Sequence, residues 1–588
     1  MKTEVRFLLA VLLMLGVLLG TNYLFPPVPP ETPTPVDSVE VAGPDAAEEG
    51  AAADPTVPVP DVADTGAPVL PEEALRDTAA GEVEAADEVV RPDGAGLPAG
   101  EGAGREVTVE GPLYRHTFST RGAELIAAEM LRYESFQDEG AVDLLPRDAH
   151  GYLGQKLVVG RDTVDLTRVL FDVEPAGGLT LTEGGGPDTL RFTYRHPTQP
   201  FAFELAYVFQ PDQYAATVEG RVRGLERPLL VTHLGDGLSF AEADSAQEAR
   251  SMAYVANHAR DGITSWNLDE SEPRVVEGPL NWAAFRSKFF VLALLAHEEE
   301  EVVAEDDFLG GMLVGRSAIG ERAEVEVTQT VAADGDFAYR VFMGPQEYAR
   351  LSDLGEDMEE VNPYGWKFFR PIVRPFVSII IGILTFLHDN LSIGYGWVLV
   401  IFGVLMRVVF FPLHHKAMKA QLRNMAVQPL VQQIQKKHKD NPEKLQKEMM
   451  KLYKEHGFNP LAGCLPMLLP WPVLIALFFV FQNAIEFRGV EFLWLPDLSA
   501  RDPLFLLPVF LGISMFLMQY VSYRSLDEPN PQLKIMMWVM PAMMVFIFLN
   551  LPSGLNLYYA TANLATLPQQ IWIAQERRKV KPIGVADS

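Results

Sequence analysis

The sequence predicts a membrane protein with an α-helical polytopic core, six transmembrane helices in total, and a large all-β domain outside the membrane. The first observation is an apolar run at 394–416, GYGWVLVIFGVLMRVVFFPLHHK, which holds a single arginine, Arg407, within the span. The second is a set of four further apolar runs that follow it. The third is a stretch of about 240 residues before it in which apolar and polar residues alternate.

Composition sets outer bounds on the chain. It has 588 residues, 48% of them hydrophobic, and a formal net charge of −30 that is unevenly distributed. This length allows several domains. Cys464 is the single cysteine, which excludes an intramolecular disulfide and a multi-cysteine metal site.

The N-terminus predicts a membrane anchor at 1–25. Lys2 and Arg6 precede a 19-residue apolar run at 7–25, which is long enough to span and is followed by PPVPPETPTP. We expect an uncleaved helix with its basic end in the cytoplasm. Residues 26–105 are rich in Pro, Ala, Gly and acidic side chains, so they predict a disordered periplasmic linker.

Residues 106–350 predict an antiparallel β-sandwich. Segments such as TLRFTYRH, FAFELAYVF and AEVEVTQTV alternate apolar and polar residues between turn residues. The acidic run HEEEE at 297–301 is best explained as a solvated turn, because consecutive residues do not converge on one metal ion. No nucleophile–base pattern stands out, so we expect neither an enzyme nor a cofactor.

Residues 364–388 predict an amphipathic helix lying in the outer membrane interface. Lys367, Arg370 and Arg374 recur at spacings of three and four, and aliphatic and aromatic residues fill much of the remaining surface. The uncharged part at 375–387 has 13 residues, which is short for a span.

Residues 393–575 predict five spans, at 393–412, 465–485, 504–520, 535–551 and 555–575, followed by a short cytoplasmic tail at 576–588. The connection at 413–463 predicts a helical hairpin whose second helix is capped by Asn441 and begins at Pro442. From 414 to 463, ten Lys or Arg minus four Asp or Glu leaves +6, which places the hairpin in the cytoplasm. Its charge suits a topology signal, or docking of a ribosome, a targeting factor or anionic headgroups.

Arg407 is the unusual residue of the first core span. Insertion of such a charge costs at least ~2.5–3.5 kcal/mol, so it requires a wet cavity or a partner. Gly396, Gly403 and Arg407 lie seven and four residues apart and share one helix face, which is expected to be concave and polar. Two interpretations remain open, an arginine that snorkels to the headgroups and a water-filled groove.

The last span carries a polar stripe. Its members lie at spacings of three, four and seven, and Gln519 ends the span at 504–520 on the cytoplasmic side. The stripe suits interhelical hydrogen bonding or, together with Arg407, a polar groove in the cytoplasmic half. Its members are Asn556, Tyr559, Asn563 and Gln570.

The C-terminal 200 residues resemble the YidC membrane protein insertases. The motifs that carry the resemblance are Arg407 followed by FFPL, EMMKLYKEHGFNPLAGCLPMLL at 448–469, DLSARDPLFLLPVFLG at 497–512 and LPSGLNLYYATANLATLPQQ at 551–570. The anchor and the β-domain resemble the Gram-negative form, whose periplasmic domain is a β-supersandwich of the sugar-mutarotase type. NWAAFRSKFF at 281–290 and VFMGPQEY at 341–348 fit its later part.

The resemblance implies an inner-membrane insertase and chaperone with a groove open to the cytoplasm and the lipid. It implies nascent membrane proteins as clients, the Sec translocon and the bilayer as partners, and contact with nucleic acid only through a ribosome. It also implies cytoplasmic termini and no catalytic group. Arg407 matches the groove arginine, and Gly403 stands where a polar residue is common. The residues matching the surface along which client helices slide are Trp471, Pro472, Pro541 and Met543.

Two other classes of protein compete with this interpretation. A solute transporter with Arg407 as its anion site predicts repeated halves, and the sequence shows no internal repeat. A membrane-anchored sugar-binding or mutarotase enzyme predicts clustered carboxylates or histidines on the β-domain, and it leaves the five later spans without a role.

Overall fold

The computed structural model describes residues 104–147, 151–267, 274–297, 309–316, 323–362, 364–365, 370–438, 441–455, 471–524 and 531–577. The predicted anchor at 1–25, nearly all of the predicted linker at 26–105 and most of the predicted tail at 576–588 lie outside these residues.

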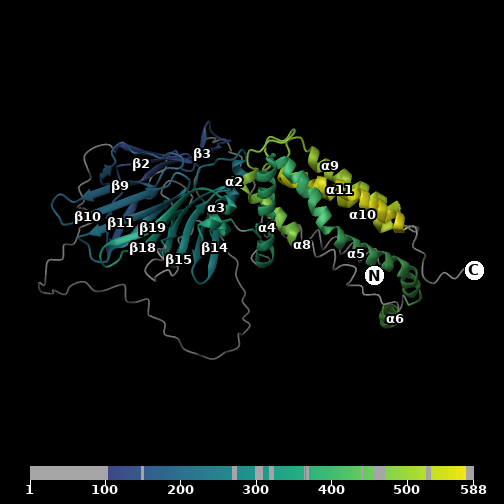
Figure 1. Cartoon of the computed structure of the whole chain (residues 1–588). Helices are drawn as coiled ribbons and strands as arrows, with labels where there is room; N and C mark the ends of the chain where they lie inside the picture. Colours follow the sequence, from purple (N-terminus) through teal and green to yellow (C-terminus); the bar gives the residue numbers. More distant parts are fainter. Residues whose placement is uncertain are drawn as a thin grey trace, which may run out of the picture. The chain divides into compact units, whose positions relative to one another are not determined.

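The β-domain is a sandwich of two sheets, as predicted, and Figure 1 shows them as stacked layers. Among the described residues, the smaller sheet has five strands, in the order β4 (Ala141–Asp143), β3 (Leu125–Glu134), β2 (Tyr114–Ser119), β1 (Glu106–Glu110) and β8 (Leu179–Thr180). Its neighbours are antiparallel except β1 and β8.

The larger sheet has 14 strands within the described part of the chain. All of its described pairs are antiparallel, and on β10 the side chain of Phe203 lies opposite Tyr194 of β9 and Val222 of β11. Its path is β6 (Asp162–Asp165), β5 (Gln155–Val159), β12 (Leu229–Gly235), β18 (Ala323–Thr330), β17 (Leu309–Arg316), β15 (Arg274–Arg286), β16 (Phe290–Ala296), β19 (Asp336–Pro345), β11 (Ala215–Arg223), β10 (Ala202–Phe209), β9 (Asp188–Arg195) and β7 (Asp172–Glu174). Beside this path, β13 (Ala253–His258) pairs with β14 (Gly262–Asn267) and with β15.

Alternate residues of the strands build the hydrophobic core between the sheets. On β2 the buried positions are Tyr114, His116 and Phe118, every second residue. The ring of Phe118 lies 5.0 Å from Tyr207 and 5.8 Å from Phe192, both on the opposite sheet. Such aromatic contacts hold the two layers together. The strands end at Pro345, within the predicted 106–350 unit. A helix, α3 (Tyr348–Asp353), and a turn of 3-10 helix, η1 (Met358–Val361), follow, and their buried residues extend the core of the β-domain beyond residue 350.

The remaining described residues are mainly helical. A short helix, α2 (Ser245–Ser251), lies between β12 and β13, and a 3-10 turn, η2 (Ile485–Phe487), follows α8. The helices after the β-domain are α4 (Arg370–Leu391), α5 (Tyr395–Lys437), α6 (Pro442–Glu455), α8 (Trp471–Asn483), α9 (Leu506–Arg524), α10 (Pro531–Phe548) and α11 (Ser553–Arg577).

The first helix of this region, α4, is longer than the predicted uncharged segment. Arg370–Leu391 is apolar enough and, with 22 residues, long enough to cross a membrane by length and composition. Its Arg374 pairs with Asp357 and Glu359, each at 2.6 Å, so this basic group is tied to the end of the β-domain. The interfacial location of the segment predicted at 364–388 stays a prediction.

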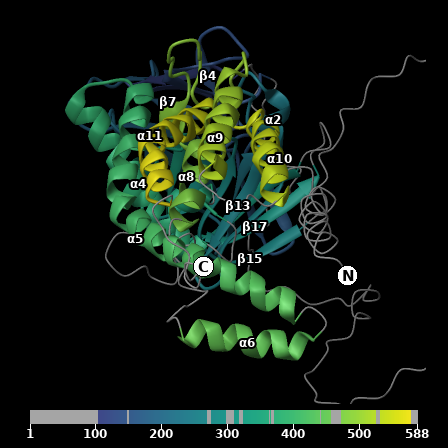
Figure 2. The same ribbon diagram turned by 90° about the vertical axis from the view of Figure 1, so that its right-hand side faces the viewer.

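The hairpin prediction at 413–463 matches the described residues in part. The apolar part of the first core helix ends at Pro412, as predicted, but the helix itself, α5, continues without a break to Lys437. At the start of α6, the backbone N–H of Lys444 donates to Oδ1 of Asn441 at 3.1 Å, which is the predicted cap. α6 packs against α5 (Figure 2).

Three described segments are long and apolar enough to cross a membrane, Arg370–Leu391, Tyr395–Pro412 and Leu506–Arg524. Pro472–Asn483 and Lys534–Phe548 are shorter apolar helices. The number of six spans therefore stays a prediction. α11 packs against both α5 and α9, α10 packs against α9, and α4 packs against α8 and α5.

Candidate functional site

The guanidinium of Arg407 binds the neighbouring helix. Its Nε donates a hydrogen bond to the backbone oxygen of Ala562 on α11, at 3.0 Å. The phenols of Tyr558 and Tyr559 are close enough to interact with the charge. Among the residues that the structure describes, no carboxylate lies within 4.0 Å of this guanidinium. Arg407 is half-buried in the structure.

A glycine brings the two helices together at this level. A methyl group added at Gly403 would lie 3.2 Å from Cγ2 of Thr561 and 3.4 Å from the oxygen of Tyr558, both on α11. The residue one turn before Arg407 therefore lets α11 approach closely, which brings Ala562 within reach of Arg407.

The expected concave glycine face of α5 is not found. Besides Gly403 against α11, an added methyl group at Gly396 would lie 2.1 Å from the ring of Phe492, so this second glycine is also covered by a neighbour. Spacing along one helix gives the direction of a face and does not show what packs on it. The expectation of a concave face at Gly396 and Gly403 was wrong for this reason.

The polar stripe of α11 is divided between different neighbours. Asn556 is 0% exposed, and its amide donates to the backbone oxygens of Phe548 at 3.1 Å and Leu551 at 3.5 Å. It therefore closes the turn between α10 and α11. Seven residues further on, Asn563 donates to Oγ of Ser514 on α9 at 3.3 Å. These two amides join helices, as the interhelical alternative predicted.

The other two stripe residues are half-buried. Tyr559 packs edge-on against Phe548, with ring centroids 5.3 Å apart. Gln570 lies two turns beyond Asn563, closer to the end of α11. Gln519, on α9, is likewise half-buried. The structure thus joins Arg407 and Asn563 through α11, and it places Asn556 at the far end of that helix.

The residues expected along the client path lie on two other helices. On α10, Pro541 is buried and Met543 is half-buried. On α8, Pro472 is half-buried, and Trp471 is the first residue of the helix, with its side chain outside the described part.

The sequence analysis missed the partner of Arg407. The oxygen of Ala562 also accepts a hydrogen bond from Oγ1 of Thr566, at 2.6 Å. A backbone oxygen has no signature in a sequence. The one available signal was Thr566, since a threonine hydroxyl in a helix commonly bonds the carbonyl four residues earlier.

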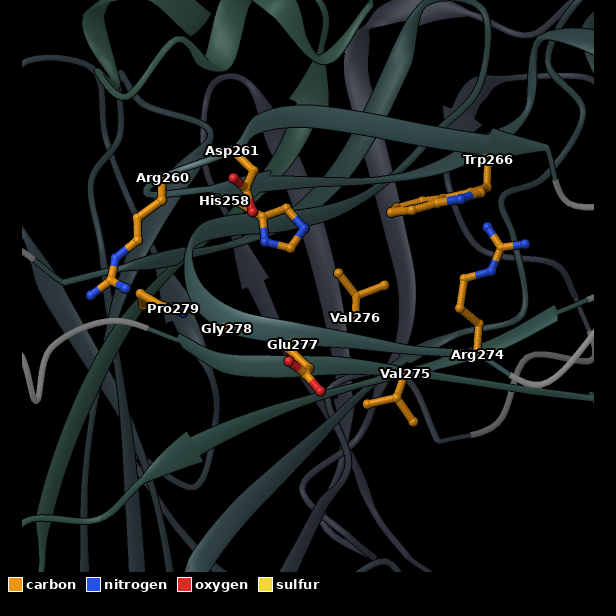
Figure 3. A pocket seen from close by; sticks show the side chains of 10 residues that line it. All are labelled: His258, Arg260, Asp261, Trp266, Arg274, Val275, Val276, Glu277, Gly278 and Pro279. Carbon is orange, nitrogen blue, oxygen red and sulfur yellow. The ribbon is translucent and has the colours of Figure 1, made fainter. Parts of the chain in front are cut away.

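The β-domain has a separate hollow of about 460 Å³ (Figure 3). Its lining includes His258 and Asp261 near the β13–β14 turn, Glu277 on β15, and Arg274, which stands 5.2 Å from the ring centre of Trp266. Both charge signs are present. Within the described residues, no group of three or more His, Cys, Asp or Glu side chains is arranged to hold a metal ion.

Comparisons with known proteins cover both parts of the chain. A model of the 60Kd inner membrane protein family matches residues 386–580, and a model of the YidC periplasmic domain matches residues 106–379. Membrane protein insertase YidC of Chlorobium luteolum is 30% identical over 518 residues, with 81% of this chain and 83% of the relative covered. The same protein of Chlorobium phaeovibrioides is 30% identical over 516 residues, with 82% and 85% covered. An active YidC insertase crystal structure, 20% identical, covers 79% of this chain and 92% of its own, with a TM-score of 0.31.

These matches define an inner-membrane protein insertase with a periplasmic domain, and nascent membrane proteins are the substrates that this class implies. The chain belongs to the YidC membrane protein insertase family.

Proposed function

We propose that this insertase receives the hydrophilic part of its client in a hydrated groove at Arg407, open to the cytoplasm. The observation that carries the proposal is the hydrogen bonding of Arg407. Its Nε is used by the Ala562 oxygen, and its two terminal amino groups have no hydrogen-bond partner among the described residues. A charged group in this state needs water or an incoming acceptor.

The physical role of such a charge is to shorten the path across the membrane. A polar segment cannot cross ~30 Å of hydrocarbon unaided, and hydration of the cytoplasmic leaflet would reduce that distance. The guanidinium attracts acidic residues of the client tail. Burial of the client's apolar helix in lipid then drives insertion, at about 25 cal/mol per Å². No bond is made or broken, so the mechanism requires no catalytic residue and no cofactor.

The partners beyond the client follow from charge and topology. The +6 segment at 414–463 (ten basic minus four acidic residues) suits docking of a ribosome or a targeting factor on the cytoplasmic side. In this topology both chain termini are cytoplasmic, and the Sec translocon is a further partner that the resemblance to the YidC family implies. Exposed basic residues of the hairpin, among them Lys444 and Lys447 on α6, support this assignment.

The test of the charge compares Arg407→Lys with Arg407→Ala in a depletion strain. Lysine keeps the charge and loses the planar fork, so it should retain insertion of clients with acidic translocated tails. Alanine should impair those clients more than clients with neutral tails. Equal defects in the two variants, at equal membrane levels, would contradict a mechanism based on charge and would make Arg407 a structural residue.

The test of hydration uses single cysteines in a Cys464→Ser background. Cysteines at Asn563 and Gln570 should react with a membrane-impermeant thiol reagent added from the cytoplasm. Ala560→Cys is the matched control, because Ala560 is on the same helix and only 3% exposed, and it should stay unlabelled. If neither test cysteine reacts in stably folded protein, the groove is dry and the proposal fails.

A further inference from the structure

The connection between α8 and α9, residues 484–505, contains a small hairpin with an exposed apolar turn. The backbone N–H groups of Phe492 and Leu495 each donate to the other's oxygen, both at 2.9 Å, which leaves Leu493 and Trp494 as a two-residue turn. Leu493 is 74% exposed, and Trp494 is also exposed. Leu504 and Phe505, just before α9, are exposed as well. We refer to Leu493, Trp494, Leu504 and Phe505 as the apolar tip.

Two residues of the apolar tip have a backbone conformation that favours glycine. Leu493 has φ 56° and Phe505 has φ 55°. A side chain with a Cβ is strained in this left-handed region, and glycine would relieve the strain at no steric cost. At Leu493, which is 74% exposed, this conformation costs stability with little burial gained within the chain. Such strain points to a contact made by the side chain outside the chain.

A buried carboxylate holds the tip in place. Asp502 is 0% exposed; its Oδ1 accepts from the indole Nε1 of Trp494 at 3.2 Å and from the N–H of Leu504 at 3.0 Å. Its Oδ2 accepts from the N–H of Leu507 at 2.7 Å, in the first turn of α9. One side chain therefore links both halves of the tip to the start of a membrane helix. These hydrogen bonds fix the conformation of the tip.

The same loop is attached to the start of α11. Ser553 Oγ donates to the oxygen of Asp497 at 2.8 Å, and the N–H of Ser553 donates to the oxygen of Ala500 at 2.7 Å. At its other end, Arg488 forms a buried ion pair with Glu242 of the β-domain at 2.5 Å. Because the β-domain is periplasmic, the loop lies at the periplasmic end of the helices.

The apolar tip continues the membrane-facing surface of the helices beside it. Leu506, Val509 and Ile513 follow directly on α9 and are exposed. On α5, exposed Trp397 stands edge-on to Phe492, with ring centroids 5.3 Å apart. Exposed apolar side chains of membrane helices face lipid, and tryptophan favours the boundary between chains and headgroups.

We propose that the apolar tip is embedded in the outer leaflet, with Leu493 and Phe505 among the upper acyl chains. Exposed Glu491 and Arg501 of the same loop then lie at the level of the headgroups or in water. This surface is separate from the groove at Arg407, and it fixes the periplasmic end of the helices to lipid. Continuity with α9 favours lipid over a second protein chain as the occupant.

The test is depth-dependent quenching of an environment-sensitive dye in the full chain. A nitrobenzoxadiazole dye is attached at Leu493→Cys or Phe505→Cys, in a Cys464→Ser background, with the protein in phosphatidylethanolamine–phosphatidylglycerol vesicles. Both dyes should emit at shorter wavelength than in water. Both should lose intensity when part of the lipid carries a doxyl group high on the acyl chain. Dyes at Glu491→Cys and Arg501→Cys are the matched controls from the same loop, and they should be quenched much less.

Two results would overturn the proposal. Water-like emission at both test sites in folded protein would show that the tip is in the periplasm. Emission at shorter wavelength without lipid quenching would show that a protein, such as a second copy of this chain, covers the tip. A second variant, Leu493→Gly with the dye at Phe505→Cys, keeps the test valid if the cysteine variants misfold. Glycine adopts φ 56° without strain, so this variant should fold. In that variant the Phe505 dye should still be quenched and the thermal midpoint should be preserved.

Discussion

Replacement of Asp502 by alanine tests whether one buried carboxylate organises the loop before α9. The substitution removes the acceptor of three hydrogen bonds, from Trp494, Leu504 and Leu507. One of these three bonds, from Leu507, satisfies an N–H in the first turn of α9, and loss of a helix cap costs about 0.5–2 kcal/mol. The Leu507 N–H belongs to a residue that is itself buried, so water replaces the lost acceptor poorly.

The expected loss of stability follows from these contacts. A donor left unsatisfied in the interior costs about 1–3 kcal/mol, and contributions from one side chain do not add fully. We therefore expect about 3 kcal/mol for Asp502→Ala, and about 1 kcal/mol for Asp502→Asn, which keeps one oxygen acceptor. A domain of about 150–250 residues loses roughly 2–4 °C of melting midpoint per kcal/mol, so Asp502→Ala should lower the apparent midpoint by about 6–12 °C.

The assay is thermal unfolding of the purified full chain in detergent. Asp389→Ala is the control, because Asp389 is exposed at the end of α4 and its loss should change stability by less than about 0.5 kcal/mol. If Asp502→Ala melts with the control, or if Asp502→Asn is as damaging as Asp502→Ala, the reasoning from hydrogen-bond acceptors is refuted.

Two further predictions concern the β-domain and the topology. Burial raises the pKa of Glu248 from its ordinary 4.5 to about 7, so the folded state holds this proton more tightly than the unfolded state does. Protonation therefore stabilises the folded chain by on the order of 3 kcal/mol. This stabilisation is complete below about pH 4.5 and is lost as the pH rises through about 7. Glu248→Gln should flatten the melting midpoint of the full chain across this window, and an unchanged profile would exclude Glu248 as its source. Lys437→Cys in a Cys464→Ser background should label from the cytoplasm only, because Lys437 is the exposed last residue of α5. Periplasmic labelling would mean that α4 crosses the membrane.

The strands that the sequence predicted individually have one face in the core and one face partly exposed to solvent. β10 and β18 lie within segments chosen for their alternation. β16, FVLALLA, is buried at all seven positions, and β13 is buried at five of its six. A strand covered on both faces has no reason to alternate. Its apolar run cannot be distinguished from a helix by periodicity, which is why these strands were not predicted individually.

The candidate site was predictable where a side chain is out of place in its surroundings. Arg407 is a charge in an apolar run, so its position alone indicates a special environment. Asn556 and Asn563 share a face by spacing, yet one closes a turn and the other reaches α9. Spacing gives the angle around a helix but not the neighbour at that angle. The apolar tip was missed because its signal is a backbone angle, which no residue pattern in that loop displays.

The continuity of α5 sets how far the basic residues at its end lie from the lipid headgroups. At about 1.5 Å per residue, a helix that leaves the bilayer at Lys416 and keeps its axis carries Lys437 about 32 Å away along that axis. The Debye length at physiological ionic strength is about 8 Å, so on a helix perpendicular to the membrane about four such lengths would separate Lys437 from the headgroups. The attraction of anionic lipid has then decayed almost completely. In that geometry, the charge of Lys437 would act on partners that approach through the aqueous phase, and lipid composition should hardly change its effect.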